Sequence, residues 1–257
     1  METTEVAGKA IPINGIGMYY ETRGEGQPLL LLHGGGGAGV NWELIFKEPP
    51  EGFRLIVPDL RGHGRSTNPS GEFTFRQFAQ DVLALLDHLG VAAFKEIGMS
   101  LGAKTLLHVA TQEAARVDAM ILVSAAPYFP EQARAIMRQV DPDNRTEAEW
   151  RQMREWHKRG DDQIRALWKM SRDFKDSYDD LNFTPPRLAT ITARTLIVHG
   201  DRDPLYPVRM ATELFDAIPG AHLWVIPDGG HGPIFGDMAE SFVNTSLAFL
   251  RGEWHRA

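Results

Sequence analysis

Apolar runs of strand length recur along the 257-residue chain, and segments with helical spacing separate them. Nearly continuous apolar runs are typical of strands that are buried on both faces of a parallel sheet. Six such runs cover residues 29–33, 53–59, 94–99, 119–125, 194–200 and 222–228. Before them, the residues around Asn14-Gly15 have the pattern of two short strands joined by a tight hairpin turn.

Helical patterns lie between most of these runs. Thr74 begins one of them, and Gln77 stands three residues later, where it would complete a capping box. A second helix is predicted from about residue 101 to 111, and a last one over residues 238–249. Strands that alternate with helices predict an α/β fold, here a mostly parallel, doubly wound sheet of about eight strands with right-handed crossovers.

One region breaks the alternation. From about residue 127 to 186 there is no strand-like run, and Thr146 with Glu149 forms another capping-box pattern ahead of a helical face rich in tryptophan. The pattern predicts a helical insertion over residues 127–186. The two flanking parts, residues 1–126 and 187–257, would together form the sheet-containing core.

The strongest chemical signal is the G-x-S-x-G motif of residues 98–102, at the end of an apolar strand and the start of a helix. That context is required of a nucleophile elbow, whose sharp turn strains the serine and needs glycines two residues to either side. A serine hydroxyl needs a base to become a nucleophile. His231 in the last glycine-rich loop, with Asp203 or Asp201 after the preceding strand, would supply a base and its acid at strand ends.

The glycine-rich loop after the first long apolar run has two interpretations. Gly34, Gly36 and Gly39 match the dinucleotide fingerprint G-x-G-x-x-G, and Asp59 ends the next apolar run. However, the 13 residues between Gly39 and Phe53 include two prolines and leave room only for a short helix, whereas the fingerprint needs a helix that opens at the glycines. Bare backbone beside a nucleophile suits an oxyanion hole better.

Together, "HGGGG", "PDLRGHGRS", "GMSLG", "HGDRDPLYP" and "GGHGP" stand in the order found in the α/β-hydrolase superfamily. The sequence resembles that superfamily over almost the whole chain outside the helical insertion, which resembles the family's cap. The resemblance implies Ser100 as the nucleophile and His231 as the base. In this superfamily the acid usually stands a few residues before a "VP"-like element, which "LYP" matches here. The resemblance therefore favours Asp203 over Asp201 as the acid. No metal or organic cofactor is implied.

The resemblance also implies that the backbone N–H groups of Leu101 and Gly35 form the oxyanion hole. In "PDLRGHGRS", the residues Asp59, Arg61 and His63 are interpreted as structural, ordering a loop near the site.

The aromatic residues of the insertion predict a mainly apolar pocket without a charged clamp. Its expected residues are Gly34, Met99, Tyr128, Trp168 and Pro233. Such a pocket favours a carboxylic-ester hydrolase for small to medium substrates. The alternatives with the same triad are a lactonase of the acyl-homoserine-lactone type, a cofactor-free perhydrolase and a C–C bond hydrolase. A serine in place of an aspartate nucleophile argues against haloalkane dehalogenase or epoxide hydrolase chemistry. A ligand receptor on the same fold also stays open.

Composition limits the partners. The formal net charge of −7 disfavours a nucleic acid, and the absence of cysteine excludes thiolate nucleophiles, disulfides and Cys-based zinc sites. No apolar run approaches the ~18 residues that span a bilayer, and the N-terminal stretch lacks the pattern of a signal peptide. These features predict a soluble, cytoplasmic protein with a small-molecule ester or lactone as substrate. They do not predict the oligomeric state.

Overall fold

The computed structural model describes residues 8–254. Residues 1–7 and 255–257 lie outside the described residues. They include much of the stretch considered for a signal peptide and the outer ends of the expected core.

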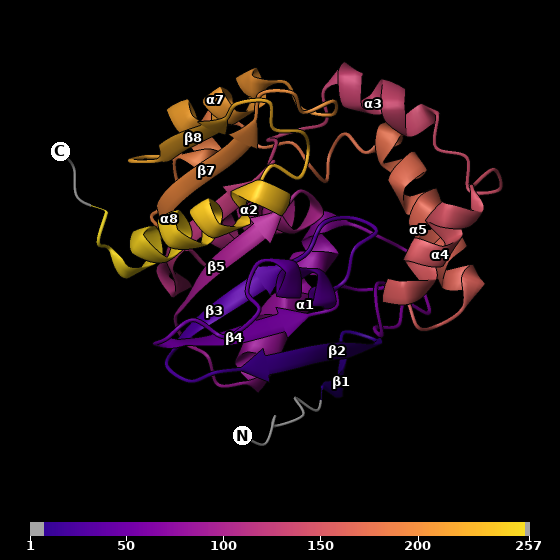
Figure 1. Ribbon diagram of the computed structural model, residues 1–257, viewed down its shortest axis with the longest axis horizontal. Helices are drawn as coiled ribbons and strands as arrows, with labels where there is room; N and C mark the ends of the chain where they lie inside the picture. Colours follow the sequence, from indigo (N-terminus) through magenta and orange to yellow (C-terminus); the bar gives the residue numbers. More distant parts are fainter. Residues whose placement is uncertain (1–7, 255–257) are drawn as a thin grey trace.

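Eight strands form one sheet in the order β1-β2-β4-β3-β5-β6-β7-β8 (Figure 1). The strands are β1 (Lys9–Ile13), β2 (Ile16–Arg23), β3 (Gln27–Leu32), β4 (Phe53–Pro58), β5 (Phe94–Met99), β6 (Val117–Val123), β7 (Arg194–Gly200) and β8 (His222–Ile226). The predicted α/β class and strand number are confirmed.

The strand order places a crevice at one end of the sheet. β1, β2 and β4 pair antiparallel, and all other neighbours pair parallel. The strand order reverses at β3, because β4 and β5, which follow it in the sequence, lie on its opposite sides. The carboxyl ends of β3 and β5 therefore flank a topological switch point, where open α/β sheets bind their ligands.

Two helical layers cover the sheet. Side chains of β3 alternate between them, since Leu30 and Leu32 belong to one apolar cluster and Leu29 and Leu31 to the other. The first cluster contains α1 (Phe75–His88), α2 (Leu101–Gln112) and α7 (Val208–Ala217), and the second contains η1 (Gly39–Leu44) and α8 (Ala239–Arg251). The short 3₁₀ turn η2 (Ala114–Arg116) follows α2, and η4 (Gly236–Met238) precedes α8. The predicted helices are present. α7 was not predicted, although Met210, Ala211 and Leu214 have helical spacing.

Helices alone connect β6 to β7. They are α3 (Glu131–Arg138), α4 (Glu147–Trp156), α5 (Asp161–Asp173), η3 (Phe174–Asp176) and α6 (Pro185–Leu188). Figure 1 shows α3, α4 and α5 together at one side of the sheet. The predicted capping box of α4 is formed, with Glu149 N donating to Thr146 Oγ1 (3.3 Å) and Thr146 N donating to the Glu149 carboxylate (2.7 Å). The expected boundary at residue 186 falls inside α6, a helix that contacts α2 and α7.

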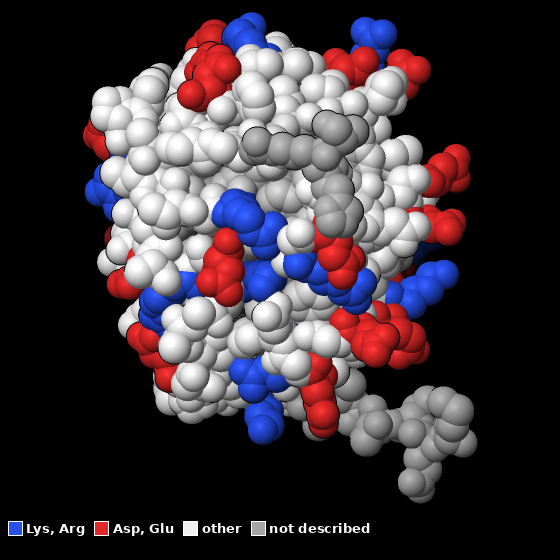
Figure 2. Space-filling view, turned by 90° about the vertical axis from the view of Figure 1, so that its left-hand side faces the viewer, with Lys and Arg blue, Asp and Glu red and all other residues white. Residues whose placement is uncertain are grey.

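The surface carries charges of both signs. Figure 2 shows acidic and basic side chains next to one another over the middle of one face. Within residues 8–254, no helix is both long enough and apolar enough to cross a membrane.

Candidate active site

A strained turn joins β5 to α2 and presents Ser100. Its backbone has φ +49° and ψ −105°, a combination that residues with a side chain rarely adopt. Glycines make the turn possible, because a Cβ on Gly98 would lie 2.7 Å from Ala103 N and one on Gly102 would lie 2.3 Å from Leu32 O. The sheet supports the strain through the bond from Ser100 N to Val123 O (2.8 Å).

Three side chains from separate loops form a continuous hydrogen-bonded chain beside this turn. His231, from the loop after β8, places Nε2 2.8 Å from Ser100 Oγ and Nδ1 2.8 Å from Asp203 Oδ2. The other carboxylate oxygen of Asp203 accepts from the backbone N–H groups of Leu205 (2.8 Å) and Tyr206 (3.1 Å). These bonds fix the carboxylate, and the carboxylate in turn fixes the imidazole plane.

The protonation states follow from these contacts. Burial by itself would raise the pKa of Asp203, but the hydrogen bond and charge of His231, together with two backbone donors, outweigh burial and lower that pKa. An ionised Asp203 accepts the Nδ1 proton of His231, so Nε2 is left to accept the Ser100 hydroxyl proton. Asp201, the other candidate, is exposed and lies 4.0 Å from the Arg202 guanidinium.

Hydrogen bonds also fix the direction of two N–H groups near Ser100. The Gly34 carbonyl accepts from Gly37 N (3.1 Å), and because a trans peptide is planar, Gly35 N–H points the opposite way. The Ser100 carbonyl accepts from Lys104 N (3.0 Å), which directs Leu101 N–H out of the start of α2. A Cβ on Gly35 would lie 3.5 Å from Leu101 Cδ1, so the glycine loop and the start of α2 are adjacent.

The glycine loop is followed only by η1, a 3₁₀ helix of six residues. This agrees with the expected short helix and gives no long helix whose N-terminus a pyrophosphate could occupy. Asp59, the residue that suited the dinucleotide pattern, instead accepts from Gly39 N (2.7 Å) and Arg65 N (2.8 Å). Arg61 forms a buried ion pair with Asp81 (2.8 Å), so this segment orders a loop as interpreted from the sequence.

A histidine at the end of α4 connects the helical segment to the glycine loop. His157 Nδ1 accepts from Gly64 N (2.9 Å), and its Nε2 donates to Gly36 O (3.0 Å). The centroid of the His63 ring lies 5.0 Å from that of His33 and 6.1 Å from that of His157. Burial lowers the pKa of both His33 and His157 to about 4, so both are neutral near pH 7. No local sequence pattern had indicated this contact.

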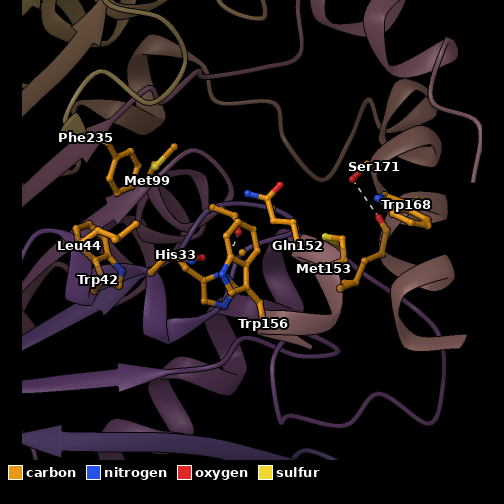
Figure 3. A pocket seen from close by; sticks show the side chains of 16 residues that line it. His33, Trp42, Leu44, Met99, Gln152, Met153, Trp156, Trp168, Ser171 and Phe235 are labelled. Carbon is orange, nitrogen blue, oxygen red and sulfur yellow. Dashed lines mark hydrogen bonds between the residues drawn. The ribbon is translucent and has the colours of Figure 1, made fainter. Parts of the chain in front are cut away.

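Two cavities meet at the glycine loop, and Gly34, Gly35, Met99 and Ser171 line both. The smaller one, about 270 Å³, has Ser100 and His231 in its wall. The larger one, about 490 Å³, lies between the loop, η1 and α4, and its wall includes Trp42, Leu44, Gln152, Trp156, Trp168 and Phe235. In Figure 3 the Gln152 amide lies between Met99 on one side and Ser171 on the other.

Two of the five expected pocket residues are not in either wall. Gly34 and Met99 line both cavities and Trp168 lines the larger one. Tyr128 lies at the surface instead, where its hydroxyl donates to Glu213 Oε1 (3.1 Å). Pro233 is buried under the loop of His231, close to Gly229. Tyr128 and Pro233 were expected in the pocket because they stand near the insertion and near His231 in the sequence. Their place in the sequence did not determine the direction of their side chains.

The pocket was expected to be mainly apolar and without a charged clamp, and the structure places one lysine in its wall. Lys104, on the first turn of α2, is 3% exposed and lines the cavity that contains Ser100. Its Nζ donates to the hydroxyl of Tyr206 (2.6 Å). The spacing of four residues from Ser100 on a helix could have placed Lys104 beside the site from the sequence. Within the described residues, no group of three or more His, Cys, Asp or Glu side chains is arranged to hold a metal ion.

Three relatives illustrate the chemistry of similar sequences. A soluble epoxide hydrolase from Corynebacterium sp. (strain C12) is 34% identical over 125 residues, which are 49% of this chain and 44% of that protein. The 2-hydroxy-6-oxo-6-(2'-aminophenyl)hexa-2,4-dienoic acid hydrolase of Metapseudomonas resinovorans is 24% identical over 92% of this chain and 88% of its own. A pimeloyl-(acyl-carrier protein) methyl ester esterase of Vibrio vulnificus (strain YJ016) is 26% identical over 90% and 97%.

Solved structures share the fold. The enol-lactonase from Burkholderia xenovorans LB400 superposes with a TM-score of 0.74 at 23% identity, covering 94% of this chain and 99% of that one. The family model described as alpha/beta hydrolase fold matches residues 27–159, just over half of the chain. Both the glycine loop and the turn of Ser100 lie inside the match. The chain belongs to the alpha/beta hydrolase fold family.

Proposed function

We propose that the protein hydrolyses carboxylic esters of small to medium, mainly apolar substrates through an acyl-enzyme on Ser100. One observation carries the proposal, namely the unbroken hydrogen-bonded chain from Ser100 through His231 to Asp203 in the wall of a largely apolar cavity. A hydroxyl, a neutral imidazole and a carboxylate in this order are the parts that acyl transfer needs.

The reaction would take two similar halves. His231 Nε2 takes the Ser100 proton while Oγ attacks the ester carbonyl, and the N–H groups of Leu101 and Gly35 stabilise the oxyanion. His231 then protonates the departing alcohol. In the second half a water molecule loses its proton to His231 and attacks the acyl-enzyme, and His231 returns that proton to Ser100 Oγ as the acid leaves. Asp203 keeps the imidazole in the required tautomer and stabilises its charged form.

The two cavities suggest how an ester would lie. The acyl group stays attached to Ser100 after the alcohol leaves, so it needs the cavity that Ser100 itself lines. At about 270 Å³, that cavity is below the roughly 300–1,000 Å³ typical of drug-sized ligands. The alcohol half can use the larger aromatic cavity past Met99. The acid would accordingly be small.

The relatives support an ester or a close chemical neighbour. The Vibrio relative is named as a methyl ester esterase, and the structural neighbour as an enol-lactonase. The Metapseudomonas relative acts on a dienoic acid, which keeps C–C bond cleavage as a competing chemistry. Ser100 in the nucleophile position argues against epoxide opening through an aspartate.

Hydrolysis of p-nitrophenyl butyrate tests the proposal. Ser100→Ala should lower kcat by roughly 10⁴-fold or more, and a fluorophosphonate should label Ser100 in the wild type. Ser171→Ala is the matched control, because Ser171 lines the same cavity but donates to Leu167 O (3.0 Å). Equal turnover by wild type and Ser100→Ala, or labelling at another residue, would overturn the proposal and leave a lactone, a C–C substrate or a receptor function to be tested.

A further inference from the structure

The cavity beside Ser100 contains a buried lysine that the proposed mechanism does not use. Lys104 is the one lysine or arginine among the residues that line this cavity. Most of the surrounding wall is apolar, and this part includes Phe75, Phe129 and Met137. An ammonium group in such a place needs an explanation, because burying a charge without a partner is costly.

Neither the helix nor the core explains Lys104. A cation on the first turn of α2 lies near the positive end of the helix dipole, which disfavours it. Burial lowers the pKa of Lys104 to about 7, although the charge of Asp203 acts in the opposite direction. A leucine or methionine would suit both the helix and the apolar wall better. The lysine is therefore unfavourable for stability at this position.

The ammonium group also has spare donors. Nζ carries three N–H donors, and within residues 8–254 it donates one hydrogen bond, to Tyr206 Oη (2.6 Å). The faces of Phe75, Phe129 and Tyr206 lie 5.6, 5.0 and 4.7 Å from Nζ and offset part of the cost of burial. Aromatic rings are weak hydrogen-bond acceptors compared with an anionic oxygen. The site therefore has more N–H donors than acceptors for them.

We propose that Lys104 and Tyr206 bind an anionic oxygen on the acyl group, so that the preferred substrates are esters of small acids that carry a second carboxylate. The inference rests on the proposed ester hydrolysis and narrows its substrate class. A carboxylate oxygen would accept from Nζ and from the Tyr206 hydroxyl, and charge-assisted hydrogen bonds of this kind are strong in a cavity of low dielectric. The apolar wall would contact the methylene groups between the two carboxyl carbons.

Matched esters test the preference. Monomethyl succinate, glutarate and adipate differ from methyl butyrate, pentanoate and hexanoate by a carboxylate in place of the terminal methyl group. The wild type should have the higher kcat/KM for the charged ester in at least one pair. The preference is the kcat/KM of the charged ester divided by the kcat/KM of the matched uncharged ester. Lys104→Met should lower this preference ratio by roughly 100-fold, and Tyr206→Phe should lower it by less. Using the ratio within each variant cancels any loss of folded protein.

Lys95→Met is the control, because Lys95 is also a buried lysine but donates to Gln27 Oε1 (2.7 Å) at the opposite end of β5. Its ratio should equal that of the wild type. An unchanged ratio in Lys104→Met, with hydrolysis of methyl pentanoate still dependent on Ser100, would overturn this inference and leave the proposed function intact.

A binding measurement separates the two proposals if neither ester is hydrolysed. Succinate, glutarate and adipate are titrated calorimetrically into Ser100→Ala and into Ser100→Ala with Lys104→Met. The best of the three should bind at least about tenfold more weakly without the lysine. Near pH 8, binding of that dicarboxylate should be accompanied by proton uptake only in the protein that retains Lys104. Equal affinities, or no binding to either protein at millimolar concentration, would refute the role of Lys104 whatever the reaction proves to be.

Discussion

The strand ends and the helical segment α3–α5 contribute to the same site in different ways. At the strand ends the backbone sets the geometry, since no Cβ fits at Gly102 or at Gly200, where it would lie 2.2 Å from Gly229 O. The helical segment contributes side chains such as Gln152 and Trp156 from a helix surface that is partly exposed. The first region permits one arrangement of reacting groups, whereas the second can accept many side chains. The arrangement of the reacting groups therefore depends on the strand ends, and the wall of the larger cavity depends partly on the helical segment.

The largest expected effect concerns the acid at the end of β7. Asp203→Asn should lower kcat for p-nitrophenyl butyrate by about 10⁴-fold, because an amide favours the wrong imidazole tautomer. Asp201→Asn, two residues away at an exposed position, should change kcat less than about threefold. Steady-state kinetics of the two variants decide the matter. A larger loss in the Asp201 variant would reassign the acid.

The next effect is on stability and tests the role of the backbone at the strand ends. A Cβ on Gly102 would meet Leu32 O at 2.3 Å, so Gly102→Ala should lower the free energy of unfolding by about 3 kcal/mol or more. Gly230→Ala is the control, since a Cβ there would meet nothing within 4 Å. Its effect should stay within about 0.5 kcal/mol. Urea titrations followed by circular dichroism measure both, and similar midpoints would contradict the steric argument.

A smaller effect is expected where the two regions touch. His157→Leu removes a donor and an acceptor and leaves Gly36 O and Gly64 N without them, which should cost about 2 kcal/mol of stability. It should also lower kcat/KM by roughly tenfold, because Gly36 follows the proposed oxyanion donor. Arg154→Ala, on the exposed side of α4, should leave kcat/KM within about twofold. Equal effects of the two variants would show that the histidine contact is dispensable.

The smallest expected effect is a pH dependence of stability. Burial lowers the pKa of His33 and His157 to about 4 from 6.5, so the unfolded chain binds more protons than the folded one below about pH 6.5. Each imidazole should therefore contribute about 1 kcal/mol of lost stability between pH 7 and 5.5. Urea midpoints across this range measure the loss. His157→Leu should show a shallower slope than the wild type, and an identical slope would contradict the assignment.

The sequence predicted what depends on local pattern. Six continuous apolar runs and the hairpin pattern around Asn14-Gly15 identified the eight strands. The motif around Ser100 with two later loops identified three side chains that the structure brings within hydrogen-bonding distance. Chain order and strand ends were sufficient because the parallel sheet collects those ends at one edge.

The parts that were missed depend on side-chain direction across long separations. His157 and Gly36 are 121 positions apart and meet only through tertiary packing. Tyr128 was expected inside and points to solvent. The spacing from Ser100 could have placed Lys104 near the site, but a lysine is usually exposed, and its burial against Tyr206 and Phe129 depends on tertiary packing.

Tyr206 gives a route to redesigning selectivity. Its backbone N–H donates to Asp203, while its hydroxyl accepts from Lys104. Any amino acid other than proline supplies the same N–H, so position 206 can be varied together with position 104 in a combinatorial library without removing that donor to the acid. A family of enzymes with different acyl preferences could then be selected from one unchanged set of reacting groups.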